Sequence, residues 1–268
     1  MTITDSSQIA ELIGSIASGR LRLVDLTNTL SSSTPTMTLP EPFASPSGFS
    51  LEELSRYDES GPFWHANDFH TGEHTGTHVD APIHWLTGKG GRDVASIPLE
   101  RLVGPACVID VRRQVVADPD FLLERSDVIE WEAEHGRLQL GSWLLLRTGW
   151  GRFADDQEAF VNADETGPHT PGVSADCARW LAEERPISGF GVETMGIDAG
   201  RAGELDPPFP LHYNLLGNDK YGVTSLQNLS ELPETGALLI VAPLRIVGGT
   251  GSPARVLALV PSGSDDAH

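Results

Sequence analysis

Histidine side chains gather in one short stretch of this chain, and they are the first residues whose type and spacing suggest chemistry. Five of the nine histidines fall between His65 and His84, in the run WHANDFHTGEHTGTHVDAPIHW. Gly76 and Pro82 oppose a helix in this run, because glycine is entropically costly in a helix and proline removes a backbone donor. We therefore expect an extended segment that presents several imidazole rings.

In an extended chain alternate side chains share a face, which places His74, His78 and Asp80 on the same side. His78 and Asp80 would lie about 7 Å apart along such a strand, a comfortable separation for holding one ion. His74 and His78 would lie about 13 Å apart on a flat strand, so the chain must bend between them, and Gly76 permits that bend. Two imidazoles and a carboxylate suit Zn²⁺, Mn²⁺ or Fe²⁺, with positions left for water. The plain alternatives are a polar surface loop and histidines that are hydrogen-bonded inside the core.

The elements that must position these side chains alternate between strands and helices. Ser126 is a predicted N-cap for a helix over residues 127–135 that ends at Gly136, and Ser174 caps a second helix over residues 175–185. This mixture, with 28 glycines and 19 prolines, predicts an α/β domain with long loops. Strand-like apolar segments recur along the chain at Leu21–Leu26, Ala106–Val111, Ser142–Thr148, Gly189–Thr194, Ala237–Pro243 and Arg255–Val260.

Two of the connecting segments have an unusual composition. Residues 31–67 are rich in proline, serine and aromatic side chains and read as a long loop, which in a compact domain is usually a lid or a binding element. The run GGTGS at Gly248–Ser252 lacks the lysine and the strand-to-helix setting of a phosphate-binding loop. We therefore predict a simple turn between strands there.

Length and charge exclude several classes of protein. The 268 residues fit one domain over residues 1–268, and the net charge of −20 argues against a general affinity for nucleic acid. The apolar runs are too short to span a membrane, and the N-terminus reads as an amphipathic helix ending at Gly19 rather than a signal peptide. Only Cys107 and Cys177 are present, so no disulfide framework is expected and the cytoplasm is the predicted location.

The run HTGEHTGTHVDAPIHW resembles the signature of the cyclase-like metal-dependent hydrolases, the family that includes bacterial kynurenine formamidase and isatin hydrolase. The resemblance implies a swivelling β/β/α fold, in which helices wrap a mixed sheet, and a homodimer or higher homo-oligomer. Further segments are similar to the family along most of the chain, namely LVDLTNTLS, TPGVSADCARWL, GFGVETMGID, LHYNLLGNDKYGVTSLQNL and GGTGSPARVLAL.

Matching positions imply roles for individual residues. His74, His78 and Asp80 are metal ligands by this resemblance, and His84 is the catalytic acid and base. The distal family histidine falls on His212, a second catalytic candidate that could contact substrate or relay a proton.

One family position differs in this chain. Formamidase-like members have a glutamate that helps hold a second metal, and the match here is Gln227. A neutral amide binds a divalent cation less strongly than a carboxylate. The isatin-hydrolase-like branch is similar in having this glutamine, which implies one Mn²⁺ or Zn²⁺ with Gln227 as a further ligand.

Aromatic residues beside the histidines suggest the substrate. Phe63, Trp64 and Trp85 could line a flat pocket for a small aromatic amide or lactam. Three other functions remain open. They are an N-formylkynurenine formamidase, an Fe²⁺ oxygenase that uses His78, Asp80 and His212, and a metal-binding module without catalysis.

Overall fold

The fold is built on one mixed sheet that closes on itself. The computed structural model describes residues 5–39 and 42–262. The sheet has eight strands in the order β1-β14-β13-β5-β7-β11-β12-β4, and β14 also pairs with β4. Its strands are β1 (Leu21–Asp25), β4 (His78–Asp80), β5 (Val103–Asp110), β7 (Trp143–Arg147), β11 (Gly189–Val192), β12 (Tyr221–Thr224), β13 (Ala237–Pro243) and β14 (Gly251–Pro261). All the strands predicted from the sequence are therefore present, and β12 was not predicted.

Alternating side chains in the central strands feed two separate cores. In β5, Cys107 and Ile109 join one buried cluster, whereas Ala106 and Val108 join the other. The first cluster lies between the sheet and the helices, because it also contains buried residues of α3 and α5. The second contains residues of β4, β12, β13 and β14 and fills the inside of the closed sheet. The two-residue period of a strand thus explains why these segments are apolar on both faces.

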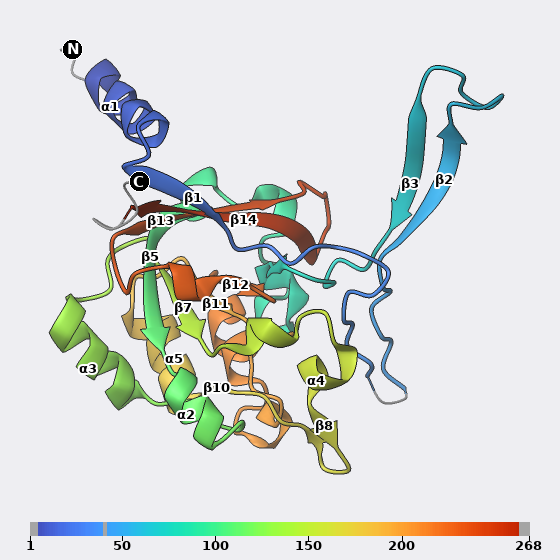
Figure 1. Cartoon of the computed structure of the whole chain (residues 1–268). Coiled ribbons are helices and arrows are strands. Elements are labelled where there is room, and N and C mark those ends of the chain that lie inside the picture. The colour runs from blue at the N-terminus through green and yellow to red at the C-terminus, as the bar shows by residue number, and fades with distance from the viewer. Residues whose placement is uncertain (1–4, 40–41, 263–268) are drawn as a thin grey trace.

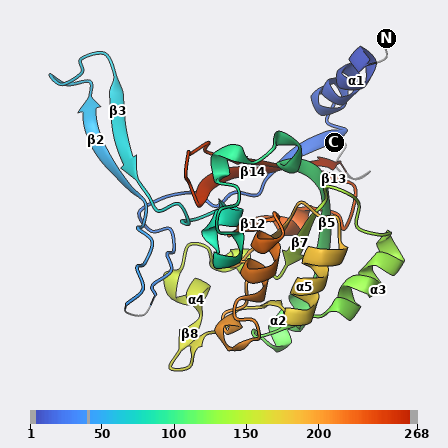
Figure 2. The same ribbon diagram turned by 180° about the vertical axis from the view of Figure 1, so that it is seen from behind.

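Helices cover one side of the sheet, as Figures 1 and 2 show. They are α2 (Arg112–Ala117), α3 (Arg125–His135) and α5 (Ala175–Glu184). The Ser174 side chain accepts a hydrogen bond from the Cys177 amide, which confirms the predicted cap of α5. The predicted cap of α3 was wrong, because Glu124 is its N-cap and forms a capping box with Asp127. The sheet wrapped by helices agrees with the predicted fold class.

The segment 31–67 contains an element that the sequence did not predict. Strands β2 (Ser50–Arg56) and β3 (His65–His70) pair as an antiparallel hairpin. Figure 1 shows this hairpin projecting away from the body of the molecule. The prediction of a long loop over residues 31–67 was wrong for β2 and for the start of β3, because their charged and polar side chains hid the period-two pattern. Smaller elements are the pairs β6 (Leu122–Leu123) with β10 (Gly172–Val173) and β8 (Ala163–Asp164) with β9 (Gly167–Pro168), and the short helix α4 (Gln157–Val161).

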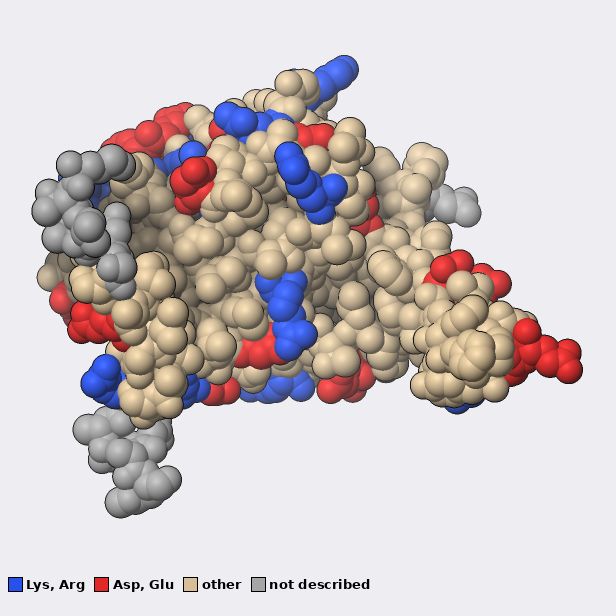
Figure 3. Space-filling model, turned by 90° about the horizontal axis from the view of Figure 1, so that it is seen from above, with Lys and Arg blue, Asp and Glu red and all other residues tan. Residues whose placement is uncertain are grey.

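The N-terminal helix and the surface charges agree with the sequence-based predictions. Helix α1 (Asp5–Ala17) stands away from the body (Figure 1), and Gly19 with a positive φ of 73° follows it. Within the described residues, no helix is long and apolar enough to cross a membrane. Figure 3 shows acidic and basic side chains in small separate groups on the face seen there, rather than in one basic patch.

Both cysteines lie in the core, as predicted for Cys107. Burial raises the pKa of Cys107 to about 11 and that of Cys177 to about 12, so both thiols stay protonated at neutral pH.

Candidate metal centre

The closing strand β4 carries the predicted ligands. His78 and Asp80 are 5% and 1% exposed, and the intervening Val79 is fully buried in the second core. Strand alternation therefore turns His78 and Asp80 together to the opposite face. The bend predicted before the strand is present, because Gly76 has a φ of 64°.

Glycines on both neighbouring strands leave room around the carboxylate. Asp80 lies opposite Gly222 of β12 and Gly251 of β14. A Cβ atom at Gly222 would lie 2.9 Å from Asp80 Oδ2, and one at Gly251 would lie 2.5 Å from His74 Cε1. Any side chain at either position would fill the space in which the ligands meet.

The three ligands converge on one point. Nitrogen atoms of His74 and His78 and a carboxylate oxygen of Asp80 all lie within 4.8 Å of one another. His74 Nδ1 lies 2.9 Å from Asp80 Oδ1, and His78 Nε2 lies 3.3 Å from the same oxygen. Two donors bound to one cation at about 2.1 Å, at right angles, would be about 3 Å apart. The donor set and its spacing therefore fit a divalent metal.

Hydrogen bonds aim the rings of both histidines at that point. His78 Nδ1 lies 2.8 Å from the Gly76 carbonyl, which only accepts, so Nδ1 carries the proton and Nε2 is free to bind a metal. Although burial alone would raise the pKa of Asp80, the nearby imidazoles of His78 and His74 hold it well below its usual value. Asp80 is consequently an anion, which suits a cation-binding group.

His84 faces the same site without being a member of the ligand group. It lies on the short 3-10 turn Pro82–His84 directly after β4, and its ring stacks on that of His74 at a centroid distance of 4.0 Å. Burial lowers the pKa of His84 to about 3, even though Asp80 acts in the opposite direction. The ring is therefore neutral at ordinary pH and can accept a proton.

His212 approaches from the opposite wall. It opens the π-helical turn His212–Leu216, and its Nε2 lies 3.9 Å from Asp80 Oδ2. Burial alone would lower the pKa of His212, but the 2.6 Å hydrogen bond from Nδ1 to Asp198 Oδ2 raises it. The ring centroids of Trp85 and His212 are 4.7 Å apart. The structure thus places His84 beside His74, His212 near Asp80 and Trp85 beside His212, and their roles stay predictions.

The comparisons with known proteins agree with this geometry. A family model described as "Putative cyclase" matches residues 24–199 of the chain. The chain belongs to this family.

Its relatives include an isatin hydrolase and kynurenine formamidases. The chain is 46% identical to an isatin hydrolase of Roseibium aggregatum over 259 residues, which are 95% of this chain and 98% of that protein. It is 30% identical over 187 residues to a kynurenine formamidase of Bacillus cereus, covering 69% of this chain and 75% of the relative. A crystal structure of an isatin hydrolase bound to the product analogue thioisatinate is 44% identical, with a TM-score of 0.94, and covers 97% of this chain and 100% of that one.

Gln227, the other predicted ligand of this cyclase-family chain, packs against Gly151. The Gln227 backbone amide donates to Leu26, and its side chain lies against Gly151, where an added Cβ would be 3.0 Å from Oε1. Gln227 Nε2 is buried and has no hydrogen-bond partner among the described residues. Its role as a ligand stays a prediction.

Phe63 and Trp64 lie at the outer end of the β2–β3 hairpin. They are 85% and 53% exposed, and Figure 1 shows that end projecting from the body that carries the metal ligands. Their contact with substrate also stays a prediction.

Sequence reasoning did not assign a role to Asp198. Its carboxylate accepts hydrogen bonds from the Leu211 and His212 amides at 2.7 and 3.1 Å, as well as from the His212 ring. The signal was available, because Asp198 is the last residue of the family-like run GFGVETMGID.

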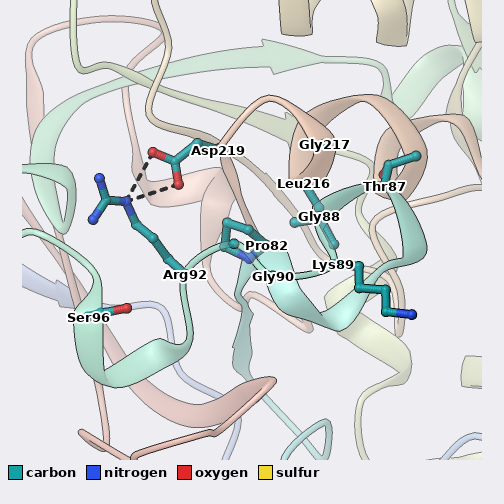
Figure 4. Close-up of a pocket in the computed structure, with 11 residues that line it drawn as sticks. Pro82, Thr87, Gly88, Lys89, Gly90, Arg92, Ser96, Leu216, Gly217 and Asp219 are labelled. Carbon is teal, nitrogen blue, oxygen red and sulfur yellow. Dashed lines mark hydrogen bonds and ion pairs between the residues drawn. The ribbon is translucent and has the colours of Figure 1, made fainter.

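A cavity of about 540 Å³ lies beside the site, bordered by Pro82 of the turn that carries His84. Figure 4 shows Arg92 paired with Asp219 on one side of it and Lys89 on the other. None of the predicted ligands lines this cavity, whose walls are Pro82, Thr87, Gly88, Lys89, Gly90, Gly91, Arg92, Ser96, Leu216, Gly217 and Asp219. It is therefore separate from the metal centre.

Proposed function

We propose that this protein is a metal-dependent hydrolase of an amide bond, and that its substrate is a small aromatic lactam of the isatin type. The observation that carries the proposal is the convergence of His74, His78 and Asp80 within 4.8 Å. The 46% identity to an isatin hydrolase over 95% of the chain supports the same reaction class.

His74, His78 and Asp80 would hold one divalent cation, Mn²⁺ or Zn²⁺, with Gln227 as a further ligand. When bound, the cation lowers the pKa of water toward neutrality and polarises the substrate carbonyl. An Fe²⁺ oxygenase built on His78, Asp80 and His212 would leave His74 without a role. The 2.9 Å contact between His74 Nδ1 and Asp80 Oδ1 favours the hydrolase instead.

The proton transfers fall to His84 and His212. Addition of water to the lactam carbonyl forms a C–O bond, and opening of the ring then breaks the C–N bond. The neutral His84 ring accepts a proton from the water and returns one to the leaving nitrogen, so the product carries a carboxylate and an amine. His212, held by Asp198, donates from Nε2 toward the developing charge.

The aromatic residues suggest how the substrate is held. Trp85 stands over the His212 ring and offers a flat wall for an indole-derived ring. Phe63 and Trp64 would contact the substrate only from the projecting hairpin, so we propose a homodimer in which they approach the site of a second copy. The buried, unpaired cysteines suit a cytoplasmic protein.

Activity assays with defined metals test the proposal. Protein that is stripped with a chelator and reloaded with Mn²⁺ or Zn²⁺ should hydrolyse isatin, and the stripped protein should not. The reaction is monitored by the loss of the visible absorbance of isatin. N-formylkynurenine is the second substrate of the assay, because kynurenine formamidases are relatives. Faster turnover of N-formylkynurenine would establish the formamidase alternative, and no turnover of any amide or lactam would favour a non-catalytic metal-binding module.

A further inference from the structure

The turn at residues 247–250, directly before β14, contacts His74 of the candidate metal centre. Thr250 Oγ1 lies 2.9 Å from His74 Nε2 and 2.6 Å from Glu73 Oε2. The Thr250 amide also donates to Glu73 Oε2, at 3.0 Å. The Thr250 carbonyl accepts from the Ala81 amide at 2.9 Å, which ties the turn to the end of β4. Glu73, Thr250 and His74 therefore form one continuous chain of hydrogen bonds.

The direction of this chain follows from the donors available. A carboxylate only accepts hydrogen bonds, so the single hydroxyl hydrogen of Thr250 goes to Glu73. The Thr250 oxygen can then only accept from the ring, which requires the His74 proton to sit on Nε2. The unprotonated Nδ1 is left facing Asp80 Oδ1 at 2.9 Å. A lone pair and a carboxylate oxygen at that distance repel each other unless a proton or a metal cation lies between them.

Packing holds the same ring in place from both sides. On one side is the Gly251 backbone, where an added Cβ would lie 2.5 Å from His74 Cε1 and 2.9 Å from Nδ1. On the other side is the stacked His84 ring, at a centroid distance of 4.0 Å. Because the ring cannot flip without losing the Thr250 contact, its orientation and its tautomer are coupled.

We propose that Thr250 and Glu73 are positioning residues, which fix His74 as the Nε2-protonated tautomer and so present Nδ1 to the metal. The inference rests on the proposed metal site but not on the identity of the substrate. It also implies that the two histidines present different ring nitrogens to the metal, Nε2 in His78 and Nδ1 in His74. Hydrogen bonds to metal-binding histidines of this kind typically change metal affinity 10- to 100-fold.

Substitutions at Thr250 distinguish the effect of its hydroxyl group from the effect of its side-chain shape in the turn. Thr250→Val keeps the shape and removes the hydrogen bond, whereas Thr250→Ser restores the hydroxyl. The matched control is Thr87→Val, which loses a 2.7 Å hydroxyl bond to the Tyr213 carbonyl outside the metal centre. Zn²⁺ affinity is measured by competition with a chromophoric chelator. We expect about 10- to 100-fold weaker binding for Thr250→Val, and wild-type binding for Thr250→Ser and Thr87→Val.

Glu73 provides a second, independent comparison. Glu73→Gln should weaken Zn²⁺ binding less than Thr250→Val does, because a neutral amide oxygen still accepts the hydroxyl hydrogen. The double variant should bind no more weakly than Thr250→Val alone, since both substitutions interrupt the same chain. Additive losses would overturn the chain, and so would equal losses in Thr250→Ser and Thr250→Val.

Nitrogen NMR of the imidazoles gives a readout that does not depend on turnover. With the His74 signals assigned from a His74→Gln spectrum, Zn²⁺-loaded wild type should show a protected Nε2 proton, and Thr250→Val should lose that protection. A His74 proton on Nδ1 would overturn the inference. If no divalent metal binds to the wild type, the proposed function fails. The metal-free spectrum then still decides, with a proton on Nε2 supporting the positioning role and a neutral ring protonated only on Nδ1 overturning it.

Discussion

The surroundings of two histidines of the site shift their pKa values in opposite directions. His84 is desolvated against the His74 ring, and its pKa is lowered to about 3. His212 is equally enclosed, but the Asp198 carboxylate raises its pKa. At neutral pH the His84 ring is therefore neutral, while the protonated form of His212 is favoured, so the two rings differ in the form that their surroundings stabilise.

Removal of a ligand should abolish the metal centre. His78→Ala leaves only His74 and Asp80 of the converging group, so we expect loss of metal binding and of activity together. Elemental analysis of the purified variant measures this outcome. Full metal occupancy would contradict the ligand assignment.

Removal of the proposed base should have a different effect. His84→Ala leaves the three ligands intact, so the variant should retain its metal and lose roughly 10²- to 10⁴-fold in turnover, the usual scale for general acid–base catalysis. Stopped-flow turnover and metal content are measured on the same sample. Parallel loss of metal would make His84 a ligand, and unchanged turnover would remove it from the mechanism.

The amide at position 227 should set the metal stoichiometry. We expect one tightly bound metal per wild-type chain, and a second equivalent of Zn²⁺ or Mn²⁺ in Gln227→Glu, because a carboxylate binds divalent cations more strongly than an amide. The burial of Gln227 Nε2 without a described partner shows that the present amide is not fully satisfied. Equilibrium dialysis gives both stoichiometries. Two metals in the wild type would contradict the one-metal proposal.

Among the elements, the small β8–β9 hairpin depends on a titrating group. His169 Nδ1 lies 2.6 Å from Asp120 Oδ2, and Nε2 lies 3.1 Å from Asp164 Oδ1. Hydrogen bonds to Asp120 and Asp164 raise the pKa of His169. The His169 imidazole thus joins the hairpin to the loop after α2, and Arg201 is the basic group that also interacts with both carboxylates.

A raised pKa gives the stability of this contact a definite pH dependence. The contribution is fully present below the unfolded pKa of about 6.5 and is lost as the pH rises through the higher folded value. We expect His169→Gln to lower Tm clearly at about pH 5.5 and much less at about pH 8.5. Calorimetry at both values measures the difference. An equal loss of Tm at both pH values would contradict a charged His169. In a protein that already carries Asp120→Asn, His169→Gln should lower Tm by less.

How far these elements could be predicted depended on where their information lies in the chain. The apolar strands such as β7 (Trp143–Arg147) and the Ser174 cap of α5 were predictable, because local composition decides them. The His74, His78 and Asp80 group was predictable for the same reason, as all three share one short segment. Thr250 was not, because it meets His74 across 176 positions of sequence, and nothing within GGTGS indicates that contact.

At the scale of the whole molecule, the projecting β2–β3 hairpin is one feature whose apolar side chains a single chain leaves exposed. Leu51 is 60% exposed, Leu54 48% and Phe69 60%, besides Phe63 and Trp64 at its end. An isolated two-stranded hairpin is marginally stable in water and needs another surface to pack against. A second copy of the chain, as proposed above, would supply that surface and bury these side chains.

Substitution at the end of the hairpin should therefore weaken association. The double variant Phe63→Ser with Trp64→Ser should shift the sedimentation profile from dimer toward monomer and lower turnover in parallel. Leu140→Ser is the control, since Leu140 is 84% exposed but lies outside the hairpin. A stable dimer with full activity would show that Phe63 and Trp64 contact neither a partner nor its substrate.

The closure of the sheet at β4 also fixes when the site can exist during synthesis. His78 and Asp80 leave the ribosome early, but the strands that flank them, β12 and the start of β14, are translated much later. At about 5–20 residues per second, on the order of ten seconds or more pass between the translation of His78 and Asp80 and that of Thr250 and Gly251. The complete surroundings of the His74, His78 and Asp80 group therefore form only after Thr250 and Gly251 have been translated.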